Sequence, residues 1–271
     1  MRTMVRWEWV VVAYAGYFAA VAWTRGYSAA LRGGTVAALI SASVFALTPA
    51  PIGTWQIVGR NWLPVVVLLA GYRLSGLFFV APMRSVEARL LAFDRRVFDA
   101  VGWKPSPSAR APVFRGALEL AYLLVYAMVP LGVVALCLAG ASNQLSRYWA
   151  VVLTACFTSY AMLPWLQTRP PRAIEDLVPA SDTPVDRTPL RRLNLAILRS
   201  SSNQVNTLPS GHVAAALAVA LMVLASAPAA GLAFLALTLA IALATVVGRY
   251  HYTVDTLAGA AVALASWWWL G

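Results

Sequence analysis

The chain has 271 residues, of which 61% are hydrophobic and only 11% are charged, and its formal net charge is +11. Because a soluble domain carries about 25% charged residues, this composition leaves too little polar surface for an exterior that faces water. The positive charge is almost all arginine in loops between apolar segments, without zinc-finger spacing or an RNA-binding pattern, so membrane lipids are expected partners and nucleic acid is not.

Apolar segments long enough to cross a bilayer as helices recur along the chain. They predict eight spans at about 8–24, 34–49, 62–81, 115–139, 147–166, 209–227, 229–247 and 253–270. The first resembles a signal peptide in part, but the spans that follow favour a retained membrane helix. We therefore expect an all-α, multi-pass helix bundle with about eight transmembrane helices in the cell membrane.

A polar linker at 82–114 separates the third span from the fourth. Its apolar residues recur at helical spacing, at Val86, Leu90, Phe93, Val97 and Val101. Charged residues fill the other side, at Arg84, Glu87, Asp94, Arg95 and Asp99. This pattern predicts an amphipathic helix that lies in the plane of the membrane interface.

A second polar linker at 167–207 joins the fifth span to the sixth. It begins with "TRPPR", which contains Arg169 and Arg172, and it leads into "LPSGH", which contains His212. Thr188 as N-cap and Pro189 as first helical residue predict a short surface helix between these two motifs.

Three polar groups are expected on one face of the membrane. The fifth span ends at Arg169 and Arg172, and the sixth begins at Ser210 and His212. His251 follows His212 by 39 residues, which is enough for one helix across the membrane and one helix back. Both histidines of the chain would therefore lie on the same face as the two arginines.

The residue types in these groups suit a phosphate ligand. Pro209 fixes the first turn of the sixth span, and Ser210, Gly211 and His212 would present free backbone N–H groups at a helix N-terminus, which is an anion site. The arginines add forked donors that match phosphate oxygens.

His251 and Asp255 are four residues apart in "HYTVD", so on a helix they share one face. The carboxylate could then orient the imidazole as a base or nucleophile. The same spacing suits two metal ligands, but no third or fourth ligand is evident nearby, so we expect no metal and no cofactor.

Together, "TRPPR", "LPSGH" and "HYTVD" make the chain resemble the type-2 phosphatidic acid phosphatase superfamily, which also contains vanadium haloperoxidases. The resemblance covers about 115–270, and the His-Tyr-x-x-Asp form is similar to the inositolphosphorylceramide-synthase-like branch. It implies a six-helix phosphatase-like core. The expected organisation is N-terminal membrane helices at 1–81, the interfacial helix and linker at 82–114, and the catalytic bundle at 115–271.

The resemblance also implies roles for individual residues. His251 would attack phosphorus, Asp255 would orient it, and His212 would protonate the leaving alkoxide. The phosphoryl oxygens would be held by Arg169, Ser210, Gly211 and an arginine near the third motif, for which Arg249 is the candidate. Two positions depart from the family pattern: Met162 stands in place of a lysine, which Arg172 would replace, and Thr245 stands in place of an arginine.

The expected activity is a metal-independent lipid phosphate phosphatase that acts through a phosphohistidine. The alternative is a phosphotransferase that moves a phosphoryl headgroup to an alcohol, and a lesser alternative is a transporter without enzymatic activity. Loop arginines are concentrated on the face that carries the histidines, which favours a cytoplasmic site, although many family members work on the opposite side.

Overall fold

The computed structural model describes residues 5–48, 53–103, 112–174, 193, 196, 203 and 205–271. All helices and loops below belong to these residues, and their only bridge of strand type pairs Thr168 with Asn206. The helices are α1 (Arg6–Thr24), α2 (Ala29–Leu47), α3 (Thr54–Gly76), α4 (Arg84–Ala100), α5 (Pro112–Leu138), η1 (Ser142–Gln144), α6 (Leu145–Ala161), η2 (Pro171–Ala173), α8 (Gly211–Ser226), α9 (Pro228–Val247) and α10 (Thr253–Leu270).

The all-helical expectation is confirmed for the described residues, and each predicted span coincides with a helix. Three helical segments are long and apolar enough to cross a membrane: Ala29–Leu47, Gly116–Leu138 and Pro228–Val247. The chain is therefore a membrane protein, while the number of eight crossings stays a prediction. The short helix predicted from Thr188 onward lies outside the described residues, apart from Leu193 and Ala196, which are both helical.

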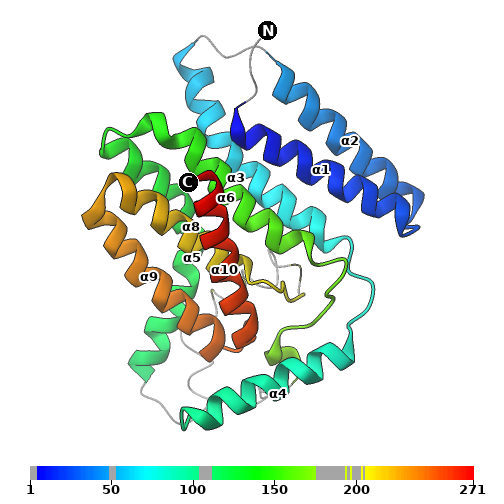
Figure 1. Cartoon of the computed structure of the whole chain (residues 1–271), viewed down its shortest axis with the longest axis vertical. Coiled ribbons are helices and arrows are strands. Elements are labelled where there is room, and N and C mark those ends of the chain that lie inside the picture. Colours follow the sequence, from blue (N-terminus) through cyan, green and yellow to red (C-terminus); the bar gives the residue numbers. More distant parts are fainter. Residues whose placement is uncertain are drawn as a thin grey trace.

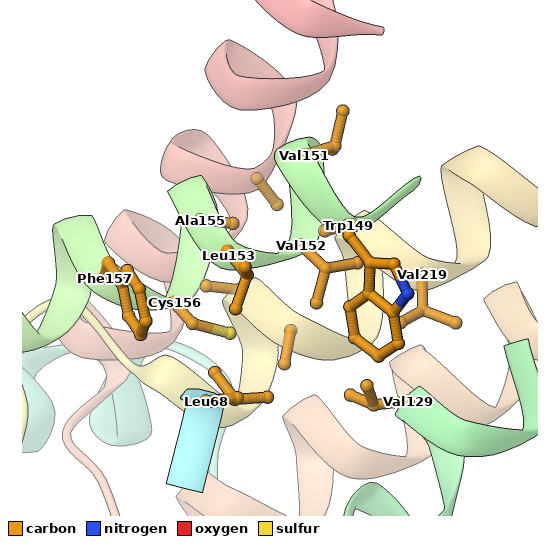
Figure 2. Packing of buried hydrophobic residues seen from close by; sticks show 14 of the residues in the cluster. Leu68, Val129, Trp149, Val151, Val152, Leu153, Ala155, Cys156, Phe157 and Val219 are labelled. Atoms are coloured by element: carbon orange, nitrogen blue, oxygen red, sulfur yellow. The ribbon is translucent and has the colours of Figure 1, made fainter. Parts of the chain in front are cut away.

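Helices α6 and α8 form the interior of the bundle. Side chains of α6 pack against α3, α5 and α8, and Figure 2 shows Val129 and Val219 near Trp149 of α6 and Leu68 of α3 near Cys156. Helix α8 contributes fully buried alanines at positions 214, 216, 218 and 220. Such small residues let helix backbones approach closely, which is how helices pack where lipid removes the hydrophobic driving force.

Helix α4 lies across one end of the bundle, beneath the ends of α9 and α10 (Figure 1). Its buried face consists of Glu87, Leu90, Leu91, Asp94 and Phe98, and Leu90 and Leu91 pack on Tyr252. The expected position of two acids was wrong: Glu87 and Asp94, which the helical pattern placed opposite the apolar residues, are buried against the bundle, while Phe93 and Val101 of the apolar face are exposed. The physical reason is that the acids have arginine partners in the bundle.

Candidate functional site

Three loop segments converge at the end of the bundle that α4 covers. The backbone N–H of Asn206 donates to the carbonyl of Thr168 at 2.8 Å, which joins the segment before α8 to the segment after α6. The N–H of Arg172 donates to the carbonyl of Arg249 at 3.1 Å, and this bond joins the segment after α6 to the turn between α9 and α10. The predicted polar groups therefore meet in space through backbone hydrogen bonds.

The two histidines face each other within this site. His251 Nε2 lies 3.3 Å from His212 Nδ1, and the ring centroids are 5.4 Å apart. The ring of Tyr122 stacks on His212 at a centroid distance of 5.0 Å, and Tyr126 meets the same imidazole edge-on at 6.0 Å. Residues from α5, α8 and the turn before α10 thus hold both imidazoles in contact.

The second ring nitrogen of His251 has two acceptors nearby. Asn206 Oδ1 lies 2.8 Å from His251 Nδ1, while Asp255 Oδ2 lies 3.4 Å from the same atom. The pattern of residues four apart identified Asp255 but missed Asn206. Asn206 reaches the ring only because its linker folds back on Thr168, and no local spacing in the sequence predicts that.

Asp255 also has a local structural contact. Its Oδ2 accepts the backbone N–H of Tyr252 at 3.0 Å, and Tyr252 is the N-cap residue of α10. A carboxylate three residues after the N-cap satisfies an otherwise unpaired donor and interacts favourably with the helix dipole. Asp255 therefore fixes the start of α10 immediately after His251.

His251 is buried, and its surroundings favour the neutral ring. Burial and the positive charge of Arg172 lower the pKa of His251 to about 3. At neutral pH the imidazole is therefore uncharged, and one of its nitrogens has a lone pair available for nucleophilic attack.

Arg172 is the arginine that the structure places on the ring stack beside the histidines. Its guanidinium lies 4.5 Å from the ring centroid of Tyr250, and Tyr250 stacks on Tyr122 at 4.0 Å. Tyr122 in turn stacks on His212. One buried guanidinium nitrogen of Arg172 has no hydrogen-bond partner among the described residues, so this side chain retains a donor for an anion.

Arg169 pairs with Glu87 of α4. The guanidinium donates to both carboxylate oxygens, at 3.1 and 2.9 Å, and the backbone N–H of Arg169 donates to the same carboxylate at 2.8 Å. Burial opposes ionisation of Glu87, but these hydrogen bonds and the charge of Arg169 outweigh it and lower the pKa of the carboxyl group. The Arg169 side chain remains 37% exposed.

Arg249 lies at the edge of the site and points toward α4. Its backbone has a φ of 57°, so the chain is not helical at this residue. Its guanidinium donates to Asp94 Oδ2 at 2.6 Å and lies over the ring of Phe98, and both charged side chains are buried. The expectation that Arg249 holds phosphate stays a prediction, and in this structure its guanidinium pairs with a buried carboxylate.

The expected free N–H groups at the start of α8 are corrected in part. The N–H of Ser210 donates to the carbonyl of Asp255 at 2.9 Å, and the N–H of Gly211 donates to Thr207 Oγ1 at 3.4 Å. Ser210 is the N-cap, and its hydroxyl oxygen accepts the N–H of Val213 at 3.4 Å. Hydrogen bonds within the loop therefore occupy the backbone N–H groups of Ser210 and Gly211, which the sequence analysis expected to be free for a ligand.

Gly211 nevertheless has a steric requirement at the site. A Cβ at this position would lie 2.6 Å from the ring of Tyr160, which is closer than Cβ atoms approach other atoms in proteins. Glycine therefore allows the start of α8 to pack directly against α6.

The described residues contain no group of three or more His, Cys, Asp or Glu side chains that could hold a metal ion.

A family model described as the PAP2 superfamily matches residues 88–269, which is more than half of the chain. The chain belongs to the PAP2 superfamily. It is therefore an enzyme of phosphatase or phosphotransferase type that acts on a phosphate-containing substrate. No curated protein and no solved structure gives a significant match. The match of this PAP2 enzyme begins within α4, so most of the helix that covers the site belongs to the matched region, while Glu87 precedes it.

Proposed function

We propose that this PAP2 enzyme is an integral membrane phosphatase that cleaves a lipid phosphate monoester or pyrophosphate through a phosphohistidine on His251. The observation that carries the proposal is the 3.3 Å contact between His251 Nε2 and His212 Nδ1. Once a phosphoryl group has moved the two imidazoles apart, they can act on opposite sides of it, one as nucleophile and the other as acid.

In the first step, the lone pair of His251 Nε2 forms a bond to phosphorus, and the bond from phosphorus to the leaving oxygen breaks. The negative charge of the bound phosphoryl group favours the imidazolium form of His212, which gives its proton to the leaving oxygen. In the second step, water attacks phosphorus, His212 takes the proton of that water, and the nitrogen–phosphorus bond breaks to release phosphate.

Arg172 supports the charge of the transferred group in this proposal. Its unpaired guanidinium nitrogen is buried beside the ring stack that leads to His212, and stabilisation by fixed donors accounts for most of the catalysis in phosphoryl transfer. Arg169 contributes once it shares its donors between Glu87 and the substrate. Ser210 keeps its hydroxyl hydrogen as a donor, because its hydroxyl oxygen accepts the N–H of Val213, and Gly211 lets the start of α8 lie close to α6.

The test is phosphate release from short-chain phosphatidate and from an isoprenyl diphosphate by the enzyme purified in detergent, with and without a chelator. Wild type should release phosphate and form an acid-labile phosphoenzyme, and His251→Gln should do neither. His212→Gln should still be phosphorylated by p-nitrophenyl phosphate, whose leaving group needs no acid, and should accumulate the phosphoenzyme. Phosphate release by His251→Gln at the wild-type rate would refute the proposal, and Arg95→Gln, on the exposed surface of α4, is the matched control.

Transfer to an alcohol uses the same first step and is the second candidate. The specific observation in its favour is the burial of His251 against His212, whose other face is covered by Tyr122, which restricts the access of water. Adding glycerol or inositol to the assay distinguishes the two reactions, because a transferase forms the corresponding phosphate ester in place of free phosphate.

We propose further that the site opens on the cytoplasmic side, on the basis of the arginine-rich linkers. The test is labelling of Ser181→Cys in intact cells, in a background with both native cysteines replaced by serine. A membrane-impermeant maleimide should label this residue only after the cells are opened, and labelling of intact cells would place the site outside.

A further inference from the structure

We propose that Asn206 is a positioning residue that keeps a proton on Nδ1 of His251 and so leaves the lone pair on Nε2. The inference rests on the function proposed above, because only a nucleophilic histidine needs one defined tautomer. The sequence pattern predicts that Asp255 makes the hydrogen bond to His251 Nδ1, whereas this proposal assigns that bond to Asn206.

The contact is short and buried. Asn206 Oδ1 lies 2.8 Å from His251 Nδ1, and neither residue is more than 4% exposed. Water therefore does not compete for this hydrogen bond, and the amide is the nearest polar group to Nδ1 that the structure describes.

Thr168 holds the amide in place. Asn206 Nδ2 donates to Thr168 Oγ1 at 3.1 Å, and the two backbones are joined by the 2.8 Å hydrogen bond from Asn206 N–H to the Thr168 carbonyl. With the NH₂ group on Thr168, the amide oxygen faces the imidazole. Since an amide oxygen can only accept, His251 must supply the proton from Nδ1.

The carboxylate of Asp255 supports the same assignment. The reverse orientation of the amide would require an unprotonated Nδ1, and that nitrogen would then present its lone pair to Asp255 Oδ2 at 3.4 Å. A proton on Nδ1 turns both neighbouring contacts into attractions. Asp255 Oδ2, which already accepts the Tyr252 N–H, is therefore a second and more distant acceptor, while Asn206 makes the short hydrogen bond.

A consequence follows for the reacting nitrogen. With Nδ1 protonated, the lone pair of the neutral ring is on Nε2, the atom that lies 3.3 Å from His212. Phosphorylation would then occur on Nε2 and not on Nδ1. Removing the amide leaves only the longer contact to Asp255, so both ring tautomers become populated.

The histidine content of the chain makes a direct test practical. Histidine occurs at two positions only, so protein labelled with ¹⁵N-histidine gives signals from two rings, and His212→Gln assigns them. Wild type should show a protonated Nδ1 on His251. Asn206→Leu, which keeps the approximate volume of the side chain, should show signal from both tautomers, and Asn206→Asp should keep Nδ1 protonated.

Activity on short-chain phosphatidate is the second readout. We expect kcat of Asn206→Leu to fall about 10–100-fold with KM changed less than threefold, since a wrong tautomer costs up to about 10⁴-fold where no second acceptor remains. Asn206→Asp should retain most of kcat. The matched control is Asn203→Leu, because Asn203 lies in the same linker but bonds to Tyr72.

An unprotonated Nδ1 in the wild type would overturn the inference, and so would wild-type kcat together with a wild-type tautomer in Asn206→Leu. If the tautomer shifts as expected but no lipid phosphate is hydrolysed by any form, the proposed function fails and the assignment of the hydrogen bond stands. If Asn206→Leu does not fold, as judged by its melting temperature, the tautomer and kcat of Asn206→Asp decide.

Discussion

Asp94 accepts a 2.6 Å hydrogen bond from the guanidinium of Arg249, and its other carboxylate oxygen accepts the backbone N–H of Thr253 at 2.9 Å. One side chain of α4 therefore contacts the turn that carries His251 and also the first residue of α10. Glu87 binds Arg169 in the same way, seven residues earlier on α4. Glu87 therefore joins α4 to the segment after α6, and Asp94 joins α4 to the turn that carries His251.

The ion pair between Asp94 and Arg249 leads to a prediction about stability. Asp94→Ala should destabilise the protein by about 3–5 kcal/mol, because it leaves the buried guanidinium without its counter-charge. The measurement is unfolding in detergent, followed by circular dichroism.

Asp99→Ala is the control for this prediction, since Asp99 lies on the exposed surface of the same helix. The double variant Asp94→Leu with Arg249→Met should recover most of the lost stability, because it removes both buried charges together. Equal stability of Asp94→Ala and Asp99→Ala would contradict the assignment.

Arg172 should affect catalysis more than Arg169 does. Arg172→Ala should lower kcat/KM for a lipid phosphate by about 10²–10³-fold, as expected for a donor to the transferred group. Arg172→Lys should recover the activity only in part, because a lysine restores the charge without the planar fork. Steady-state kinetics in mixed micelles provides the measurement, with Arg95→Ala as the control.

Arg169→Ala should cost less, because the carboxylate of Glu87 already engages most of the donors of Arg169. A larger loss for Arg169→Ala than for Arg172→Ala would mean that the substrate displaces Glu87 completely.

The pH dependence follows from the environment of His251. Since burial and Arg172 lower the pKa of this residue to about 3, His251 should stay neutral well below the ordinary histidine pKa of about 6.5. In Arg172→Ala the pKa of His251 should rise, so the acid limb of kcat/KM should move to higher pH. The substrate's own ionisation is common to both enzymes and cancels in the comparison.

Stability provides a second pH readout. Below about pH 6.5 the unfolded chain binds a proton at this histidine that the folded chain excludes, so stability should fall as the pH drops from about 6.5 toward 3. His251→Gln should lessen this dependence, and an unchanged slope would contradict the lowered pKa.

Gly259 of α10 should be intolerant of a side chain. A Cβ there would lie 2.5 Å from the carbonyl oxygen of Ser210, so Gly259→Ala should push α10 away from the loop that precedes α8. We expect a loss of about 1–3 kcal/mol in stability together with a drop in kcat.

Gly116→Ala is the matched control in α5, because a Cβ there meets nothing within 4 Å. That change should leave activity unaltered and raise helix stability slightly. Equal effects of the two substitutions on melting temperature and kcat would contradict the close approach.

Much of the helical arrangement could be predicted because length and hydropathy determine where a chain forms apolar helices. The two histidines could be placed on one face because their separation of 39 positions allows one hairpin of helices. The contacts of Arg249 and Asn206 could not be predicted. They depend on a left-handed backbone at residue 249 and on a linker that folds back to Thr168, and neither follows from local periodicity.

The burial of Glu87 and Asp94 was missed for a related reason. Helical periodicity separates apolar from charged residues, and it assigned both acids to the solvent side. Their partners are arginines more than 80 positions away in the sequence, so only the folded chain shows that this charged face is an internal one.

The contact between the two imidazoles has a consequence for the enzyme without substrate. A protonated Nδ1 on His251 makes its Nε2 an acceptor, so the N–H of His212 caps the lone pair that would otherwise be reactive. An incoming phosphoryl group has to separate the two rings before it can react. In the proposed mechanism, the nucleophilic nitrogen of His251 is therefore blocked by hydrogen bonding in the resting enzyme, and substrate binding itself exposes it.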